Sequence, residues 1–69
     1  MRLSARNVLK GKVTQVTTGQ TTAHVKIEIA PGTVVTASIT NEAVAELRLK
    51  PGDAAYAVIK ASDVMVARD

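Results

Sequence analysis

Residues 23–29 carry the most regular pattern in this chain, an alternation of apolar and polar side chains. Successive side chains of a β-strand point to opposite faces of a sheet, so this pattern predicts a strand with one buried face and one solvated face. His24, Lys26 and Glu28 are expected to point outward. The residues expected to point inward are Ala23, Val25, Ile27 and Ile29. This is the clearest strand in the sequence.

Turn residues on both sides of this strand predict antiparallel neighbours. A turn at residues 17–20 precedes the strand, and Pro31-Gly32 follows it with a residue pair that favours a tight reversal. We therefore expect a first strand that starts at residue 4 and runs to residue 16, and a third over residues 34–39. Gly11 lies inside the first strand, where a glycine marks a sharp bend or the close approach of another backbone.

The hydrophobic period changes after the third strand. Thr40 and Asn41 both suit a helix cap, an acidic residue follows them, and the next apolar residues share one helical face. One short helix is expected here, with Ala43, Val44 and Leu47 on its apolar face.

The rest of the chain predicts two further strands. Pro51-Gly52 turns the chain into a fourth strand over residues 54–60, and residues 61–63 separate it from a fifth over residues 64–67. The expected fold is all-β with one short helix, an OB-like five-stranded small barrel. We expect it to form a single domain over residues 1–69.

The chain is too short to bury a large core by itself. It has 69 residues, no cysteine and only one histidine, so neither a disulfide bond nor a structural zinc site can stabilise it. Hydrophobic residues nevertheless make up 46% of the sequence. We therefore expect a homo-oligomer whose subunit contacts bury part of this apolar surface. The net charge of +3 suits an anionic partner, although the basic residues are scattered along the chain.

The sequence contains no arrangement typical of an enzyme. His24 lies in the middle of a strand, and no pair of carboxylates has a spacing suited to acid–base catalysis. The four glycines stand apart and form neither a P-loop nor a dinucleotide fingerprint. An OB-like barrel often binds nucleic acid, but stacking on bases needs aromatic side chains and Tyr56 is the only one. A nucleic-acid-binding module with weak, salt-dependent contacts stays as the alternative.

Hydrogen-bond donors gather in three short segments. Ser4 and Arg6 share one face of the first strand, Thr40 lies at the start of the helix, and Lys60 and Ser62 lie at the end of the fourth strand. Hydroxyl, guanidinium, ammonium and backbone N–H groups together suit a small, fully deprotonated oxyanion. From these residues alone an alternative stays open. Arg6 could form a surface ion pair, and Lys60 and Ser62 could simply flank a surface turn.

Six segments, in this order, resemble the molbindin (Mop) family. They are Ser4-Ala5-Arg6-Asn7, Leu9–Val13, Ile39-Thr40, Leu49 with Pro51-Gly52, Ile59-Lys60-Ala61-Ser62 and Val64–Val66. The resemblance covers essentially the whole chain. It implies a small cytoplasmic protein that binds molybdate or tungstate for storage or homeostasis, without enzymatic activity. No stretch approaches the roughly 20 apolar residues of a transmembrane helix, and no His, Asp and Glu cluster has metal-ligand spacing, so we expect no membrane partner and no metal held as a bare cation.

The resemblance also implies how the oxyanion is held. Members of the family assemble as a hexamer, a trimer of dimers, with oxyanions at the subunit interfaces. By position, Ser4, Ala5 and Arg6 of one subunit contribute to the pocket. The residues that complete the pocket are Thr40, Ala43, Lys60, Ala61 and Ser62. Ala43 stands where relatives have serine, so the resemblance implies one hydroxyl donor fewer at this site.

Overall fold

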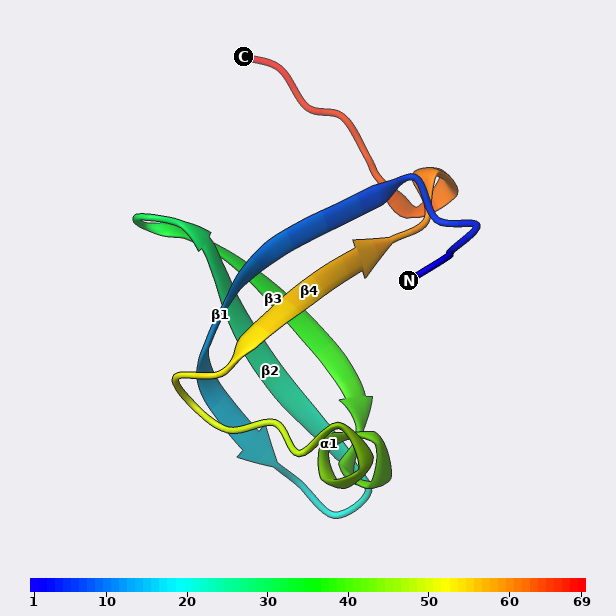
Figure 1. Ribbon diagram of the computed structural model, residues 1–69. Helices are drawn as coiled ribbons and strands as arrows, with labels where there is room; N and C mark the ends of the chain where they lie inside the picture. The colour runs from blue at the N-terminus through cyan, green and yellow to red at the C-terminus, as the bar shows by residue number, and fades with distance from the viewer.

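A computed structural model describes residues 1–69 as one four-stranded antiparallel sheet with a short α-helix and a 3₁₀ turn. The sheet order is β3-β2-β1-β4, and it curls so that β4 crosses the face of β2 and β3 (Figure 1). The result is an OB-like half-barrel, which confirms the mostly-β fold with one short helix. The elements are β1 (Asn7–Thr18), β2 (Thr22–Ala30), β3 (Thr33–Thr40), α1 (Asn41–Leu47), β4 (Ala54–Ile59) and the 3₁₀ turn η1 (Ala61–Asp63).

The strand predicted from the alternating pattern is β2, and it lies inside the sheet between β1 and β3. Val25 pairs with Val16 on one side and with Ala37 on the other. The alternation is confirmed along most of the strand, because its inward residues are buried as far as Ile27. Ile29 is only half-buried, since the register with β3 shifts between Glu28 and Ala30.

The buried core of this chain is small. Only five of the 69 residues are buried, and none of them is polar or charged. They are Val13, Ala23, Val25, Ile27 and Ala57. Large apolar side chains such as Leu47 and Tyr56 are exposed, at 65% and 49%. A single copy of this chain therefore leaves much of its apolar surface in water.

Gly11 marks a close approach of two backbones, as predicted. It lies in β1 opposite Ala55 of β4, and an added Cβ atom there would overlap the carbonyl oxygen of Glu28. The same atom would lie 2.8 Å from Cγ2 of Ile27. A side chain at this position would push β1 away from β2, so only glycine permits this curvature of the sheet.

β1 pairs with β4 along its first half and with β2 along its second half, and a loop bonds to it where the two halves meet. The backbone N–H of Val13 donates to the carbonyl of Asp53 at 2.8 Å, and Gly52 N–H donates to the carbonyl of Val13 at 2.8 Å. The register of β1 with β2 shifts between Val13 and Gln15. The loop after α1 thereby ties the helix to the point where β1 bends.

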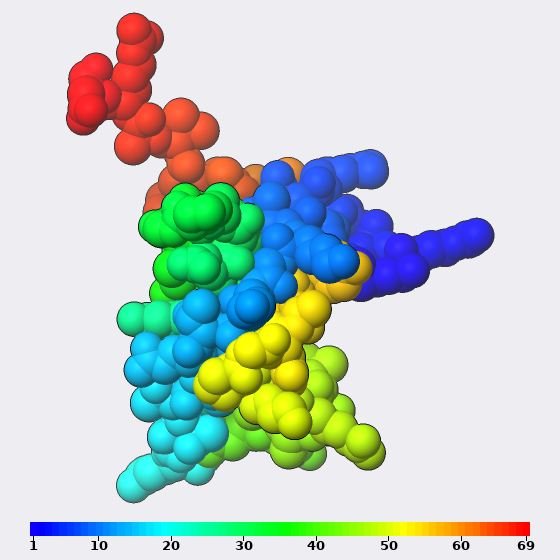
Figure 2. Space-filling view, turned by 60° about the vertical axis from the view of Figure 1, so that its left-hand side comes forward, coloured from blue at the N-terminus to red at the C-terminus, as the bar shows by residue number.

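The predicted fifth strand is wrong. Residues 64–67 belong to no strand, and the side chains of Val64, Met65 and Val66 are 49%, 93% and 93% exposed. Their β-branched composition favours extended backbone, but a strand also needs a neighbour for its backbone hydrogen bonds. This segment leads away from the body of the chain (Figures 1 and 2) and has no such neighbour.

The predicted ends of two strands also need correction. β1 begins at Asn7 rather than at Ser4, and β4 ends at Ile59 rather than at Lys60. Asn7 and Ile59 are the last register pair between these strands, so the residues beyond them have no strand partner. No helix of the chain has the length and apolar character needed to span a membrane.

Candidate functional site

The pairing of β1 with β4 brings two of the predicted donor segments together. Asn7 pairs with Ile59, and its side-chain Nδ2 donates to the carbonyl of Ile59 at 3.3 Å. Arg6 and Lys60 each lie one residue beyond this pair, so they leave the sheet at the same end. Figure 1 shows the N-terminal segment and η1 side by side there. We call residues 4–6 and 60–62 the donor end.

The donor end offers several kinds of hydrogen-bond donor to solvent. Ser4, Arg6, Lys60 and Ser62 are exposed, whereas Ala5 is half-buried. Because the charged and hydroxyl groups lie outside the sheet, they are free to turn toward a ligand. The two cationic side chains carry donors that suit oxyanions, the guanidinium as a planar fork and the ammonium as a compact charge.

The 3₁₀ turn adds backbone donors to this end. Asp63 N–H donates to the carbonyl of Lys60 at 2.9 Å, which closes the turn. The N–H groups of Ala61 and Ser62 precede this bond, so they have no acceptor within the turn. Asp63 is also exposed and adds one carboxylate beside these donors. The donor end therefore combines two cations, two hydroxyls and two N–H groups, and one acid lies next to it in the sequence.

The third predicted segment lies elsewhere in the chain. Thr40 is the N-cap of α1, and its Oγ1 accepts a hydrogen bond from Ala43 N–H at 3.0 Å. This confirms the cap, but it also means that the N–H group of Ala43 already has an acceptor. The hydroxyl hydrogen of Thr40 stays available for donation. Figure 1 places α1 at the opposite end of the sheet from η1, so one chain does not join Thr40 and Ala43 to the donor end.

Asn41 holds the start of α1 in place, a role that the sequence did not single out. Its backbone N–H donates to the carbonyl of Thr21 at 2.9 Å, and its Nδ2 donates to the carbonyl of Gly19 at 2.9 Å. Its Oδ1 is buried without a hydrogen-bond partner. The β1–β2 turn and the helix start are thus fixed to each other, which orients Thr40.

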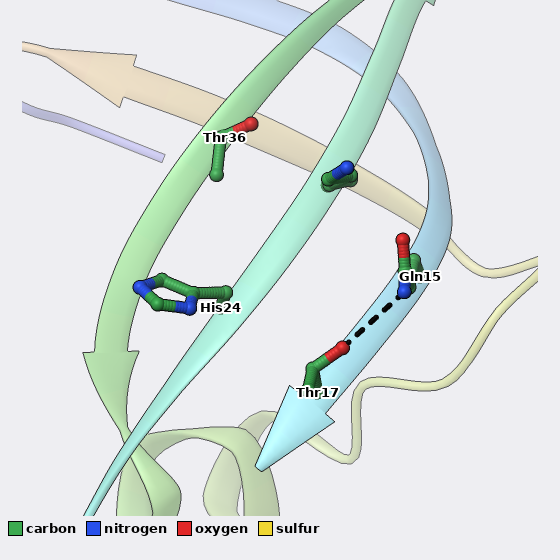
Figure 3. Close-up of a pocket in the computed structure, with 5 residues that line it drawn as sticks. Gln15, Thr17, His24 and Thr36 are labelled. Carbon is green, nitrogen blue, oxygen red and sulfur yellow. Dashed lines mark hydrogen bonds between the residues drawn. The ribbon is translucent and has the colours of Figure 1, made fainter. Parts of the chain in front are cut away.

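A polar depression of about 320 Å³ lies on the outer face of β1, β2 and β3 (Figure 3). All of its lining side chains are exposed, and Gln15 Nε2 donates to Thr17 Oγ1 at 3.4 Å. His24 is one of them, and no carboxylate lies beside it to make it a general base. The alternating sequence pattern predicts that His24 and Lys26 point outward, but only the register between the strands brings all five lining residues together. They are Gln15, Thr17, His24, Lys26 and Thr36.

A larger apolar groove of about 730 Å³ occupies the concave side of the half-barrel. Fourteen of its fifteen lining residues are hydrophobic, and Thr36 is the exception. Tyr56 lies in this groove, so the one aromatic side chain of the protein belongs to an apolar surface. The lining residues are Met1, Val25, Ile27, Val35, Thr36, Ala37, Ile39, Leu47, Leu49 and all six residues of β4.

Comparison with known proteins agrees with this architecture. The family model of the TOBE domain matches residues 3–66, so the chain belongs to the TOBE domain family. It is 48% identical over 66 residues to the probable molybdenum-pterin-binding protein of Haemophilus influenzae, an alignment that covers 96% of both chains. The solved structure of MopII from Clostridium pasteurianum superposes with a TM-score of 0.90 at 45% identity, over 97% of this chain and 100% of that chain.

A second structure adds a ligand-bound relative. The cytoplasmic molybdate-binding protein ModG, solved with molybdate bound, matches with a TM-score of 0.89 at 54% identity. The match covers 94% of this chain and 46% of ModG, so this chain spans about half of that protein. Within the TOBE domain family, the chain is therefore a member of the molbindin (Mop) family.

Proposed function

We propose that this protein binds molybdate or tungstate at its subunit interfaces and serves intracellular molybdenum storage and homeostasis. The family relationship supports an oxyanion ligand, since the ModG structure holds molybdate. ModG is described as cytoplasmic, and we propose the same location here. The role is that of a single Mop domain over residues 1–69 that binds and releases its ligand without chemical change.

The observation that carries this proposal is the donor end. The register pair of Asn7 and Ile59 places Arg6 beside Lys60 at one end of the sheet. Molybdate is fully deprotonated near neutral pH and only accepts hydrogen bonds, so it needs a site made of donors. Charge-assisted bonds from a guanidinium and an ammonium are among the strongest that a protein can offer to such an anion.

The positions of the other predicted ligand residues support a site shared between subunits. Thr40 and Ala43 lie at the start of α1, at the opposite end of the sheet from η1, so we propose that they meet the donor end of another copy. We therefore propose an oligomer, a hexamer built as a trimer of dimers. In it, Ser4, Ala5, Arg6, Lys60, Ala61 and Ser62 form one part of each pocket, and Thr40 and Ala43 form another.

Equilibrium dialysis tests the function directly. The oligomeric protein is dialysed in parallel against molybdate, tungstate and a single-stranded oligonucleotide at physiological salt. We expect saturable binding of both oxyanions and no retention of the oligonucleotide, because the single aromatic residue, Tyr56, lies in an apolar groove. Binding of the oligonucleotide without binding of molybdate would contradict the proposal and favour a nucleic-acid module.

A further inference from the structure

Three contacts fix the position of Thr40, the predicted ligand residue at the start of α1. Its Oγ1 accepts a hydrogen bond from Ala43 N–H at 3.0 Å, and its backbone forms the end register pair of β2 and β3, with Thr22. The third contact comes through the next residue, Asn41, whose backbone N–H donates to the carbonyl of Thr21 at 2.9 Å. The helix start is thereby attached to the turn between β1 and β2, which lies beside α1 (Figure 1).

The side chain of Asn41 adds a second bond to this turn. Its Nδ2 donates to the carbonyl of Gly19 at 2.9 Å, across 22 positions of sequence. The turn is itself closed by a hydrogen bond, because Gly19 N–H donates to the carbonyl of Thr22 at 2.8 Å. A Cβ atom at Gly19 would lie only 2.9 Å from that carbonyl oxygen, so the turn is also tight. Asn41 therefore joins the helix start to a well-defined anchor.

The Asn41 amide is held from one side only. A carbonyl oxygen accepts hydrogen bonds and cannot donate them, so the NH₂ group of Asn41 must face Gly19. The other amide atom, Oδ1, is buried, and no group of the chain donates to it. Replacing the NH₂ group therefore removes the whole side-chain anchor between the helix start and the turn.

A fixed Thr40 offers a ligand one hydroxyl donor in one place. Its oxygen already accepts from Ala43 N–H, so the hydroxyl hydrogen is directed away from that bond. The hydroxyl cannot advance toward a smaller anion without breaking the cap bond or moving the helix start. Sulfate has shorter bonds to its oxygens than molybdate has, so a donor fixed at the distance that suits molybdate makes a longer and weaker hydrogen bond to sulfate.

We propose that Asn41 is a positioning residue that makes the site selective for molybdate and tungstate over sulfate, by holding Thr40 in place. The inference rests on the proposed function, in which Thr40 belongs to the pocket. Asn41 does not touch the anion and acts only through Thr40. Without the bond to Gly19, the helix start is free to follow a smaller anion, and the site accepts sulfate more readily.

Hydrogen exchange of the protein without ligand tests whether Asn41 holds the cap. N41A removes the anchor, and N41L removes it while keeping a side chain of similar volume. In both variants we expect the amide of Ala43 to exchange about tenfold faster than in the parent chain, while amides in the middle of β2 keep their rates. The matched control Q20A removes an exposed side-chain amide of the same turn and is expected to change neither. Unchanged exchange at Ala43 in both Asn41 variants would overturn the proposal.

Competition calorimetry with molybdate and sulfate tests the selectivity. The ratio of the sulfate to the molybdate dissociation constant is expected to fall about tenfold in N41A and N41L, the effect of one ordinary hydrogen bond, and to stay unchanged in Q20A. A general loss of stability would weaken the binding of both anions alike and leave this ratio unchanged. An unchanged ratio in both variants, or a fall in N41A alone, would therefore overturn the proposal, because structure or packing would then explain the effect.

The T40A background shows whether Asn41 acts through Thr40. The ratio in T40A/N41A is expected to equal the ratio in T40A, because the group that Asn41 positions is absent. A further fall in the double variant would overturn the proposal. A parent chain that binds no molybdate would contradict the proposed function, and the selectivity role with it, whereas hydrogen exchange at Ala43 would still decide whether Asn41 holds the cap.

Discussion

At the scale of single residues, position rather than charge distinguishes Arg6 and Lys60 from the other basic residues. Asn7 and Ile59 are 52 positions apart in sequence, yet their register pair sets Arg6 and Lys60 next to each other. Lys10 and Lys26 carry the same charge but lie on the strands, exposed to solvent. Only Arg6 and Lys60 lie next to the same end pair of β1 and β4, which is why we assign them to the proposed site.

The first prediction follows from this difference. Arg6→Ala and Lys60→Ala are each expected to weaken molybdate binding by roughly tenfold to a hundredfold, since each removes a charge-assisted hydrogen bond. Lys10→Ala and Lys26→Ala remove the same formal charge. At these positions the lysine acts on the anion only through a screened long-range interaction, so we expect the affinity to change by less than about threefold. Calorimetric titration of the four variants checks this. Equal small losses at all four positions would indicate diffuse electrostatics instead of a site.

At the scale of elements, the stability of α1 comes from its N-cap, because the helix is too short to be stable by its own hydrogen bonds. The helix has seven residues, none of them buried, and Thr40 satisfies one N–H group of its first turn. Short helices are marginally stable without such support, because forming the first turn fixes the dihedral angles of several residues in exchange for a single hydrogen bond. The start of α1 is held further by Asn41, which bonds to the β1–β2 turn.

The second prediction concerns this cap. Thr40→Ala is expected to lower the free energy of unfolding by about 1 kcal/mol, the usual cost of losing an N-cap hydroxyl. Thr40→Ser keeps the hydroxyl and is the matched control, expected to stay within about 0.5 kcal/mol of the parent chain. Urea unfolding of the protein without ligand measures both. If Thr40→Ser were as unstable as Thr40→Ala, the methyl group rather than the cap bond would be responsible.

At the scale of the whole molecule, the chain is short of buried surface. A core of five buried residues gives one folded copy little stability, while Met65 and Val66 are almost fully exposed. The proposed association between copies would bury this surface in a chain without disulfides. Ligand binding between subunits would then add to the stability of the assembly.

The third prediction joins assembly to ligand binding. The protein is expected to sediment as an oligomer at micromolar concentration, and molybdate at a hundredfold excess over its dissociation constant is expected to add about 2.7 kcal/mol of stability per site. Sedimentation equilibrium and thermal unfolding measure these effects. A well-folded monomer of 7.2 kDa, or no thermal shift at millimolar molybdate, would contradict a site between subunits.

The fourth prediction concerns selectivity of the assembled site. Molybdate and tungstate are expected to bind well, sulfate poorly and phosphate very poorly. Phosphate carries a proton at neutral pH, and a proton left without an acceptor among donors costs about 1–3 kcal/mol. Sulfate has no such proton, but its shorter bonds leave the same donors too far away. Competition dialysis with the four anions checks both arguments, and D63N tests whether the nearby carboxylate of Asp63 accepts the phosphate proton.

The sequence by itself determined the features that depend on neighbouring residues. The alternation around Val25 indicated β2, Pro31-Gly32 indicated the turn after it, and Thr40-Asn41 indicated the start of the helix, because each acts through contacts a few positions away. Gly11 was identified for the same kind of reason, since a glycine inside a strand is rarely without a steric cause. The donor segments were also recognisable, as residue types in a given order.

Only the tertiary structure decided how many strands form and which donors meet. Val64–Val66 has the composition of a strand, but a strand exists only where another backbone supplies hydrogen bonds, and none lies beside it in one chain. The pairing of Asn7 with Ile59 brought Arg6 to Lys60 and left Thr40 at the other end. Register is a relation between distant segments, so the local pattern of either segment does not contain it.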